Sequence, residues 1–290
     1  MSMAQAEEAA GLWSPHDPDA AWERLAPSQT WKALPVPDPS QPKPPDHTRF
    51  VCMSDTHARP LQMKVPEGDV FLHAGDFSNV GLSQDIQKFD SFLKALPHQH
   101  KVVIAGNHDL SFDLESYDSI WHKFQPKKEE PKVVKQLLRN CTYLEDSGTV
   151  INGIRIWGSP WQPWFCDWAF NVERGELMKY WKLIPTDTDV LMTHGPPIGH
   201  GDECKPAGNR AGCVELLQQI QERIRPKYHI FGHIHEVSLG CGPQELLVSA
   251  QGYGVTTDGT TTYINASTCT YQYRATNPAI VFDMPNVSSP

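Results

Sequence analysis

The sequence lacks several features that mark common protein classes. None of its seven cysteines form a CxxC pair, so neither a zinc knuckle nor a thioredoxin-like motif is present. Their odd number and wide spacing predict free thiols in a reducing compartment. No apolar run approaches the ~18 residues that a membrane helix needs, and residues 1–13 lack the apolar core of a secretory signal. We therefore expect a cytoplasmic protein without a membrane partner.

Clustered basic residues are also missing. The net charge is -9, and Lys127 and Lys128 are followed at once by Glu129 and Glu130. Proteins that bind duplex nucleic acid usually present a basic face, because neutralising phosphates supplies most of their affinity. We therefore expect no large nucleic-acid interface, although bound metal ions would still attract a small anionic substrate. The oligomeric state stays open.

The composition is that of a folded domain, with 39% hydrophobic and 20% charged residues. Residues 1–46 differ from the rest, because six prolines crowd positions 35–45. Proline fixes φ and removes a hydrogen-bond donor, so this segment is predicted to be an extended, partly polyproline arm. We expect its tryptophans to lie on the surface of a domain spanning 47–290; docking of the arm to a partner is the alternative. These tryptophans are Trp13, Trp22 and Trp31.

Short apolar runs that end in polar residues recur along the chain. They are Arg49–Ser54, Asp69–Ala74, Lys101–Ala105, Asp189–Thr193 and Tyr228–Phe231. Their length, their Val, Ile and Phe content and their flanking turn residues predict buried strands. Further strands are expected in 261–267 and 279–283, and a hairpin is expected in 142–159 with Asn152 and Gly153 as its turn.

Helical spacing of apolar residues occurs between these strands. Residues 84–96 carry Ile86, Phe89 and Leu93 on one face, with Ser83 as the expected N-cap. A second helix is expected over 210–224. Strands alternating with helices predict a layered α/β domain with a mixed sheet or two sheets.

Polar residues of the kinds that bind metals follow these strands. They are Asp55, His57, Asp76, Asn107, His108, Asp109, His194, His233 and His235. Ligand sites in α/β sheets form at the carboxyl ends of strands, so these side chains are expected to meet in one crevice. Each motif alone is weak evidence for a metal site. His73 lies inside a predicted strand and is expected to be a core or supporting histidine. Their joint occurrence at strand ends predicts a metal centre.

The expected ligands are carboxylates, an amide carbonyl and imidazoles, without thiolate. This set suits Mn²⁺, Fe or Zn²⁺, and we expect Mn²⁺; an all-oxygen Ca²⁺ or Mg²⁺ cage would not use four histidines. There are too many ligands for one ion. Two ions ~3.5–4 Å apart that share a bridging carboxylate would use them all and would hold both the attacking and departing oxygens of a phosphoryl transfer.

The order D-x-H, G-D, G-N-H-D, H-G and G-H-x-H resembles the calcineurin-like metallophosphoesterase superfamily. Stretches such as VIAGNHDLSFD, LMTHGPP and RPKYHIFGHIHE are similar to the metallophosphoesterase-domain-containing (MPPED) family, from about residue 46 to the C-terminus. The resemblance implies a four-layer αββα sandwich with two mixed β-sheets flanked by helices. It also implies a metal-dependent phosphoesterase.

The resemblance assigns a role to each residue. Asp55, His57 and His235 would hold one ion, Asn107, His194 and His233 the other, and Asp76 would bridge both. A hydroxide opposite Asp76 would attack the phosphate, which Asn107 and His108 would contact. His108 would protonate the leaving alkoxide or hold the phosphate, and Asp109 would fix its tautomer.

Two departures from the family bear on activity. Some vertebrate MPPED members replace the first histidine of G-H-x-H with Gly, whereas His233 is present here, which predicts a more competent enzyme. Residues 237–251 resemble an insertion that decorates the entrance of the site.

Substrate selectivity is less defined by the sequence. Arg210 would grip a phosphate in two-pronged fashion, or would be a solvated arginine at a helix start. Several aromatic residues would stack a base or pack a hairpin: Trp157, Trp161, Trp164 and Phe165. We predict a phosphodiesterase acting on nucleotides or cyclic nucleotides. The alternative is a nucleotide-binding regulatory or scaffold protein with low turnover that retains the metal site; a protein phosphatase and a DNA nuclease fit less well.

Overall fold

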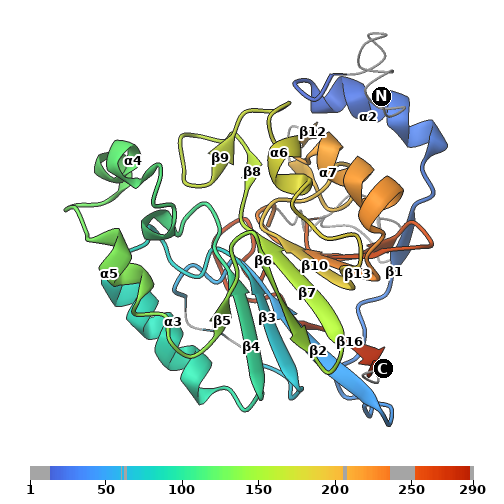
Figure 1. Ribbon diagram of the computed structural model, residues 1–290, viewed down its shortest axis with the longest axis horizontal. Coiled ribbons are helices and arrows are strands. Elements are labelled where there is room, and N and C mark those ends of the chain that lie inside the picture. The colour runs from blue at the N-terminus through green and yellow to red at the C-terminus, as the bar shows by residue number, and fades with distance from the viewer. Residues whose placement is uncertain (1–13, 60, 62–63, 205–207, 236–251, 288–290) are drawn as a thin grey trace.

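The computed structural model describes residues 14–59, 61, 64–204, 208–235 and 252–287. A five-stranded and a seven-stranded sheet face each other, and helices cover both outer faces (Figure 1). Both sheets mix parallel and antiparallel pairs. The predicted α/β sandwich of two mixed sheets flanked by helices is therefore confirmed.

The five-stranded sheet has the order β16-β2-β3-β4-β5. Its strands are β2 (His47–Met53), β3 (Val70–Ala74), β4 (His100–Ile104), β5 (Thr142–Tyr143) and β16 (Ile280–Pro285). Strands β2 to β5 are parallel, and β16 joins β2 in antiparallel fashion. The carboxyl ends of β2, β3 and β4 therefore lie along one edge.

The seven-stranded sheet has the order β1-β14-β15-β13-β10-β7-β6. Its strands are β1 (Lys32–Leu34), β6 (Ser147–Ile151), β7 (Ile154–Ser159), β10 (Val190–Thr193), β13 (Tyr228–Phe231), β14 (Gly254–Thr257) and β15 (Thr262–Asn265). The central strands β15, β13, β10 and β7 are parallel. Two short ribbons stand apart: β8 (Gln162–Pro163) with β9 (Asn171–Val172), and β11 (Glu203–Cys204) with β12 (Asn209–Arg210).

Successive side chains of a strand alternate between the core of the sandwich and the helices outside. In β2, Phe50 and Cys52 enter the core between the two sheets, whereas Val51 and Met53 face the helices outside. Successive side chains of a strand point to opposite faces, so a strand buried on both faces must be apolar throughout. This requirement is why the predicted strands are continuous apolar runs.

Helices cover the two outer faces separately. α3 (Ser83–Ala95), α4 (Tyr117–Phe124), α5 (Pro131–Lys135) and the 3₁₀ turn η2 (Leu110–Phe112) lie on the side of the five-stranded sheet (Figure 1). α2 (Pro18–Leu25), η1 (Ala26–Ser28), α6 (Met178–Trp181), α7 (Val214–Gln218) and the π-helical η3 (Gln219–Ile224) lie on the other side.

The first predicted helix is confirmed, because Ile86, Phe89 and Leu93 are all buried. Its predicted N-cap is wrong. Ser83 is already the first helical residue, and its hydroxyl donates to the carboxylate of Glu129 (2.8 Å) instead of capping the helix.

Two further boundaries differ from the prediction. The second helix begins at Val214 rather than at 210, because Arg210 belongs to β12 and pairs with Glu203. The predicted hairpin turn is present, with positive φ at Asn152 and Gly153, but it joins β6 to β7. β5 instead pairs with β4 in the other sheet.

The arm is more structured than its prolines predict. Residues 18–25 form α2, and β1 pairs with β14 at the edge of the seven-stranded sheet. Trp22 packs against the α7 layer, and Trp31 is 37% exposed, whereas Trp13 lies outside the described residues. The predicted insertion at 237–251 also lies outside them. Among the described helices, none has the length and apolar character needed to cross a membrane.

Candidate metal centre

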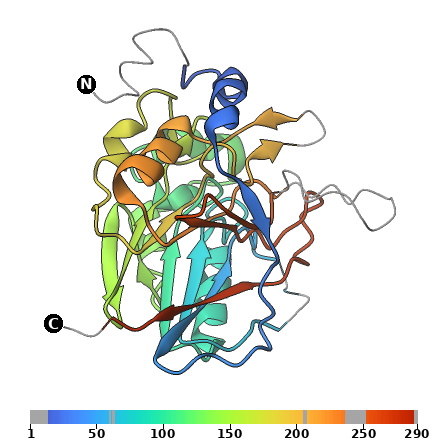
Figure 2. The ribbon, with the colours of Figure 1, turned by 90° about the vertical axis from the view of Figure 1, so that its right-hand side faces the viewer.

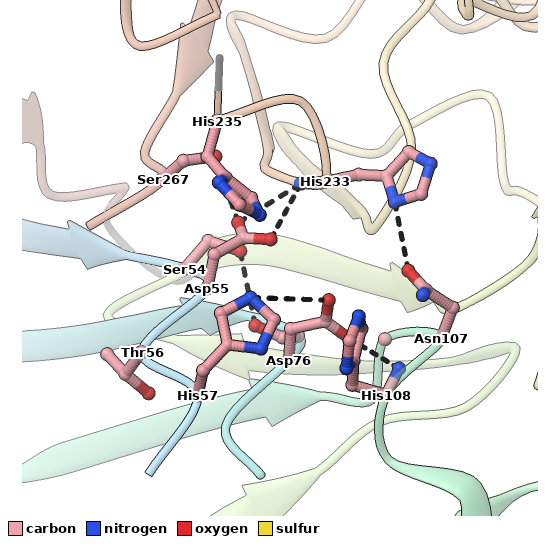
Figure 3. A network of polar contacts seen from close by, with 12 residues as sticks. Ser54, Asp55, Thr56, His57, Asp76, Asn107, His108, His233, His235 and Ser267 are labelled. Carbon is pink, nitrogen blue, oxygen red and sulfur yellow. Dashed lines mark hydrogen bonds and ion pairs between the residues drawn. The ribbon is translucent and has the colours of Figure 1, made fainter. Parts of the chain in front are cut away.

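The predicted ligands come from both sheets and meet at their facing carboxyl ends (Figure 3). Asp55 and His57 follow β2, Asp76 follows β3, Asn107 follows β4, His194 follows β10, and His233 and His235 follow β13. The structure brings all of these side chains into one cluster.

The contacts within the cluster form two overlapping groups. Ligand atoms of Asp55, His57 and His235 all lie within 4.8 Å of one another. Asn107 forms the centre of the second group, because its Oδ1 lies 2.9 Å from a ring nitrogen of His194 and 2.9 Å from one of His233.

Asp76 lies between the two groups. Its Oδ2 is 3.8 Å from Nε2 of His57 and 3.5 Å from Nε2 of His194. Asp55, Asp76 and His194 also form a group whose ligand atoms lie within 4.8 Å of one another. The carboxylate that the resemblance assigns as the bridge thus contacts histidines of both groups.

The backbone at the cluster is held in an unusual conformation. Asp55, His57, Asp76 and His233 have φ of 52°, 44°, 56° and 67°. The left-handed region costs a residue with a side chain on the order of 1–3 kcal/mol and persists where surrounding structure enforces it. Here the enforced turns direct each side chain back toward the shared crevice.

Glycines of the motifs allow the close packing of these turns. A Cβ on Gly232 would lie 2.1 Å from Oδ2 of Asp55, and one on Gly106 would lie 2.3 Å from Oδ1 of Asp76. A real Cβ does not approach other atoms this closely, so both positions require a residue without a side chain.

Hydrogen bonds to the outer atoms of the ligands fix their orientation. Both oxygens of Asp55 accept the backbone N–H of His233, at 3.1 and 3.0 Å, and one accepts the hydroxyl of Ser267. Nδ1 of His194 lies 2.8 Å from the carbonyl oxygen of Ala74. Such contacts leave the remaining ring nitrogen to face a metal ion.

Burial and mutual charge shift the pKa values of the cluster residues in the metal-free protein. Burial lowers the pKa of His57 well below its usual value, and burial lowers that of His233 to about 3, so both imidazoles are neutral. Burial opposes ionisation of Asp76, but the nearby histidines, His194 foremost, lower its pKa well below the usual range. Burial opposes protonation of His194, yet the charge of Asp76 raises its pKa to about 9.

Unsatisfied polar atoms show that the cluster fits a metal ion. Both ring nitrogens of His57 are buried and have no hydrogen-bond partner among the described residues. A buried polar atom without a partner costs ~1–3 kcal/mol, which coordination would recover. Neutral imidazole, carboxylate and amide oxygen together suit a divalent transition metal.

His108 belongs to the same cluster, since one of its ring nitrogens lies within 4.8 Å of ligand atoms of His57 and Asp76, but the prediction that Asp109 is its hydrogen-bond partner is wrong. Its Nδ1 lies 2.7 Å from the carbonyl oxygen of Asn79, and its ring stacks on Trp168 with centroids 4.1 Å apart. Asp109 instead accepts the backbone N–H groups of Asp76, Gly106 and Ser78, together with the Ser78 hydroxyl. Its carboxylate is fully used in joining the loops after β3 and β4.

A cavity of about 420 Å³ opens above the cluster. It is lined by Asp76, Asn107, His108, Pro163, Trp164, Phe165, Arg174, Cys204, Arg210, Ala211, His233, Ile234, His235, Tyr271 and Tyr273. Arg210 is therefore near the cluster, as expected, but it is no solvated arginine at a helix start. Its guanidinium pairs with the buried carboxylate of Asp202.

Of the other residues named in the sequence analysis, some line the cavity and others lie in the hydrophobic core. Trp164 and Phe165 line it, whereas Trp157 and Trp161 pack against the hydrophobic core. His73 is fully buried, with Nε2 3.1 Å from the hydroxyl of Thr56, and it lies in the core as expected.

Sequence reasoning missed several lining residues, among them Arg174 and Tyr273. The guanidinium of Arg174 donates to the carbonyl oxygens of Ala211 and Gly212. The ring of Tyr273 lies 4.9 Å from that of His57, between centroids. Neither residue belongs to a motif, and no periodic pattern marks them.

Comparison with known proteins identifies the family. The model of the calcineurin-like phosphoesterase family matches residues 48–237, most of the chain. The chain belongs to the calcineurin-like phosphoesterase family. It is 48% identical over 271 residues to metallophosphoesterase domain-containing protein 1 from Homo sapiens, covering 90% of this chain and 78% of that protein. It is 41% identical over 286 residues to UPF0046 protein T07D4.2 from Caenorhabditis elegans, covering 93% and 68% of the two chains.

Family membership gives the residue cluster its chemical meaning. The chain is a metal-dependent phosphoesterase, and the cluster is its candidate dinuclear metal site. The resemblance to the calcineurin-like and MPPED families is thereby confirmed.

Proposed function

We propose that this calcineurin-like phosphoesterase is a cytoplasmic phosphodiesterase that acts on nucleotide-like diesters with two Mn²⁺ ions. Asp55, His57 and His235 would hold one ion, Asn107, His194 and His233 the other, with Asp76 shared. When bound, such a pair of ions lowers the pKa of a water molecule and offsets charge on the phosphoryl group. The observation that carries the proposal is the convergence of these side chains in one cluster, of which Asp76, Asn107, His233 and His235 line the same cavity as His108.

His108 has the position of a group that acts on the substrate. Its Nδ1 donates to the carbonyl oxygen of Asn79, so Nε2 is the nitrogen left to meet a ligand. Trp168 supports one face of the ring, and the backbone N–H of His108 donates to Oδ1 of Asp76 (2.8 Å). His108 would therefore hold a phosphoryl oxygen or pass a proton to the leaving alkoxide.

Asp109 and Asn107 would support the reaction from the same loop. The Asp109 carboxylate fixes the loops that carry Asp76 and Asn107, so it acts as a positioning residue. Asn107 would contact the phosphate beside the ion that it holds.

The preference for nucleotide-like substrates rests on aromatic side chains around the cavity. Trp164, Phe165, Tyr271 and Tyr273 line it and are 51%, 49%, 61% and 41% exposed. Exposed aromatic faces beside a phosphate site suit a planar base, and stacking contributes ~1–3 kcal/mol per base. The two guanidinium groups nearby, of Arg174 and Arg210, favour an anionic ligand.

The test compares diester and monoester hydrolysis by the Mn²⁺-loaded protein. We expect bis-p-nitrophenyl phosphate and a cyclic nucleoside monophosphate to be hydrolysed faster than p-nitrophenyl phosphate. His108→Ala should lower kcat by ~10²–10⁴-fold, whereas His122→Ala, an exposed histidine on α4, should not. Tight nucleotide binding without turnover would replace the enzyme proposal with a regulatory or scaffold role, and activity that survives metal removal would indicate a contaminant.

A further inference from the structure

One wall of the substrate cavity is a small ribbon, β11–β12, that is anchored from outside by the N-terminal arm. Cys204, Arg210 and Ala211 of this segment line the cavity beside the metal cluster. Helix α2 lies against β12, and Figure 2 shows it beside the ribbon at the top of the molecule. The family model matches residues 48–237, so α2 lies outside the matched segment.

Hydrogen bonds from Asp19 hold the backbone of the ribbon. Oδ1 of Asp19 accepts the N–H of Arg210 (2.8 Å), and Oδ2 accepts the side-chain amide of Asn209 (3.3 Å). Asp19 lies in the first turn of α2, whose N-cap is Asp17. The carboxylate of Asp19 on α2 therefore binds the backbone of Arg210, and Arg210 also lines the cavity.

Trp22 holds the side chain of the same arginine. Cζ of Arg210 lies 4.8 Å from the centroid of a Trp22 ring, which is within range of a cation–π contact. The indole is itself seated tightly, because a Cβ on Gly199 would lie 2.1 Å from it. Trp22 has no room to shift toward Gly199, so it forms a fixed platform for the guanidinium.

The guanidinium is also held from its other side. Asp202, which is fully buried, pairs with Nη1 of Arg210, and Glu203 lies 3.8 Å from Nη2. Arg210 side-chain atoms are 16% exposed, so most of the group is fixed while part of it faces the cavity. Arginine loses considerable side-chain entropy on being ordered, and here the arm and Asp202 meet that cost before a ligand arrives.

We infer that helix α2 is a positioning element of the substrate cavity, in which Asp19 and Trp22 hold Arg210 ready to contact the anionic group of the substrate. The substrate part of this inference rests on the proposed function. The contact between the arm and the ribbon does not, because it involves none of the candidate metal ligands.

The kinetic test separates this role from general stability. Trp22→Ala should raise KM for bis-p-nitrophenyl phosphate about fivefold, the loss expected for one cation–π contact, with kcat within about twofold. Trp22→Phe should restore KM, because it keeps an aromatic face. Trp121→Ala, which removes a half-buried tryptophan of α4 on the other side of the sandwich, serves as the matched control.

A double-mutant cycle tests whether Trp22 acts through Arg210. In an Arg210→Ala background, Trp22→Ala should leave KM unchanged, since the group that it positions is gone. Effects on KM that simply multiply would overturn the inference, as would a Trp22→Ala variant whose loss appears in kcat alone.

A second readout needs neither metal nor substrate. In the metal-free protein, Asp19→Ala and Trp22→Ala should each accelerate hydrogen exchange at the backbone amide of Arg210 about fivefold. Asp19→Asn keeps an acceptor oxygen and should leave exchange near the wild-type rate. Unchanged exchange in both alanine variants would overturn the inference. Faster exchange in a protein that hydrolyses no phosphate ester would uphold the arm contact and refute the proposed function instead.

Discussion

Replacing Gly232 with alanine tests the packing on which the metal centre depends. The new Cβ would lie 2.1 Å from Oδ2 of Asp55 and 2.1 Å from Oγ of Ser54. Ordinary contact begins at 3.4 Å, so the Asp55 carboxylate must move by about 1.3 Å (3.4 − 2.1). The hydroxyl of Ser54 blocks relief on the same side. Both oxygens of Asp55 would also lose their alignment with the N–H of His233.

A shift of this size far exceeds the ~0.2 Å tolerance of metal–ligand distances. We expect affinity for the ion held by Asp55 to fall at least ~10²-fold, and kcat/KM for bis-p-nitrophenyl phosphate to fall ~10²-fold. Overpacking should lower the free energy of unfolding by ~1–3 kcal/mol.

The assay is metal content by mass spectrometry after gel filtration, with hydrolysis measured on the same sample. Gly148→Ala is the control. Its Cβ would also make a close contact, at 3.0 Å from the carbonyl oxygen of Ile156, but Gly148 lies in β6, and none of the candidate ligands follows that strand. It should keep wild-type metal content and activity. A Gly232→Ala protein with two tightly bound ions and normal turnover would show that the close packing of Gly232 against the Asp55 carboxylate is not needed for metal binding or activity.

Three further predictions concern individual histidines. His108→Gln should reduce kcat ~10²–10⁴-fold while metal content stays at the wild-type value; loss of metal would make His108 a ligand instead. His233→Gly should lower metal content from two ions per chain to one, measured by mass spectrometry; a wild-type protein that binds a single ion would contradict the two-site assignment. The pKa of His194 is raised to about 9 by Asp76, above its usual 6.5, so the stability that its proton contributes is complete below pH 6.5 and is lost as pH rises through 9. Urea unfolding of metal-free protein should therefore show falling stability between these pH values, and His194→Gln should flatten the trend; an unchanged trend in the variant would assign it to other groups.

The layers of the fold follow from local pattern, but their edges do not. Phe50, Val51, Cys52 and Met53 are apolar because both faces of β2 are covered, and such a run is visible in the sequence. The start of α7 is not visible. Helical spacing extends back toward Arg210, yet long-range bonds to Asp19 hold that residue in β12. A pattern within one segment carries no information about a partner far away in the chain.

The predicted cluster was accessible from sequence because each of its residues follows a strand, and parallel strands end along one edge. The supporting contacts were not accessible. Asp109 neighbours His108 in sequence but bonds to the backbone at Asp76 and Gly106, while His108 pairs with Asn79. Which of several acceptors a side chain reaches depends on turn geometry, which composition and spacing leave open.

The candidate ligands are divided between two sheets that pack on each other largely through apolar side chains. Asp55 and Asp76 belong to one sheet, and His194 and His233 belong to the other. A bound ion would therefore link the two sheets through its ligands and would resist any sliding of one sheet over the other. Removing the metal with a chelator would then abolish the activity and lower the stability of the domain at the same time. The metal-free protein would be cleaved by proteases more readily than the metal-loaded protein.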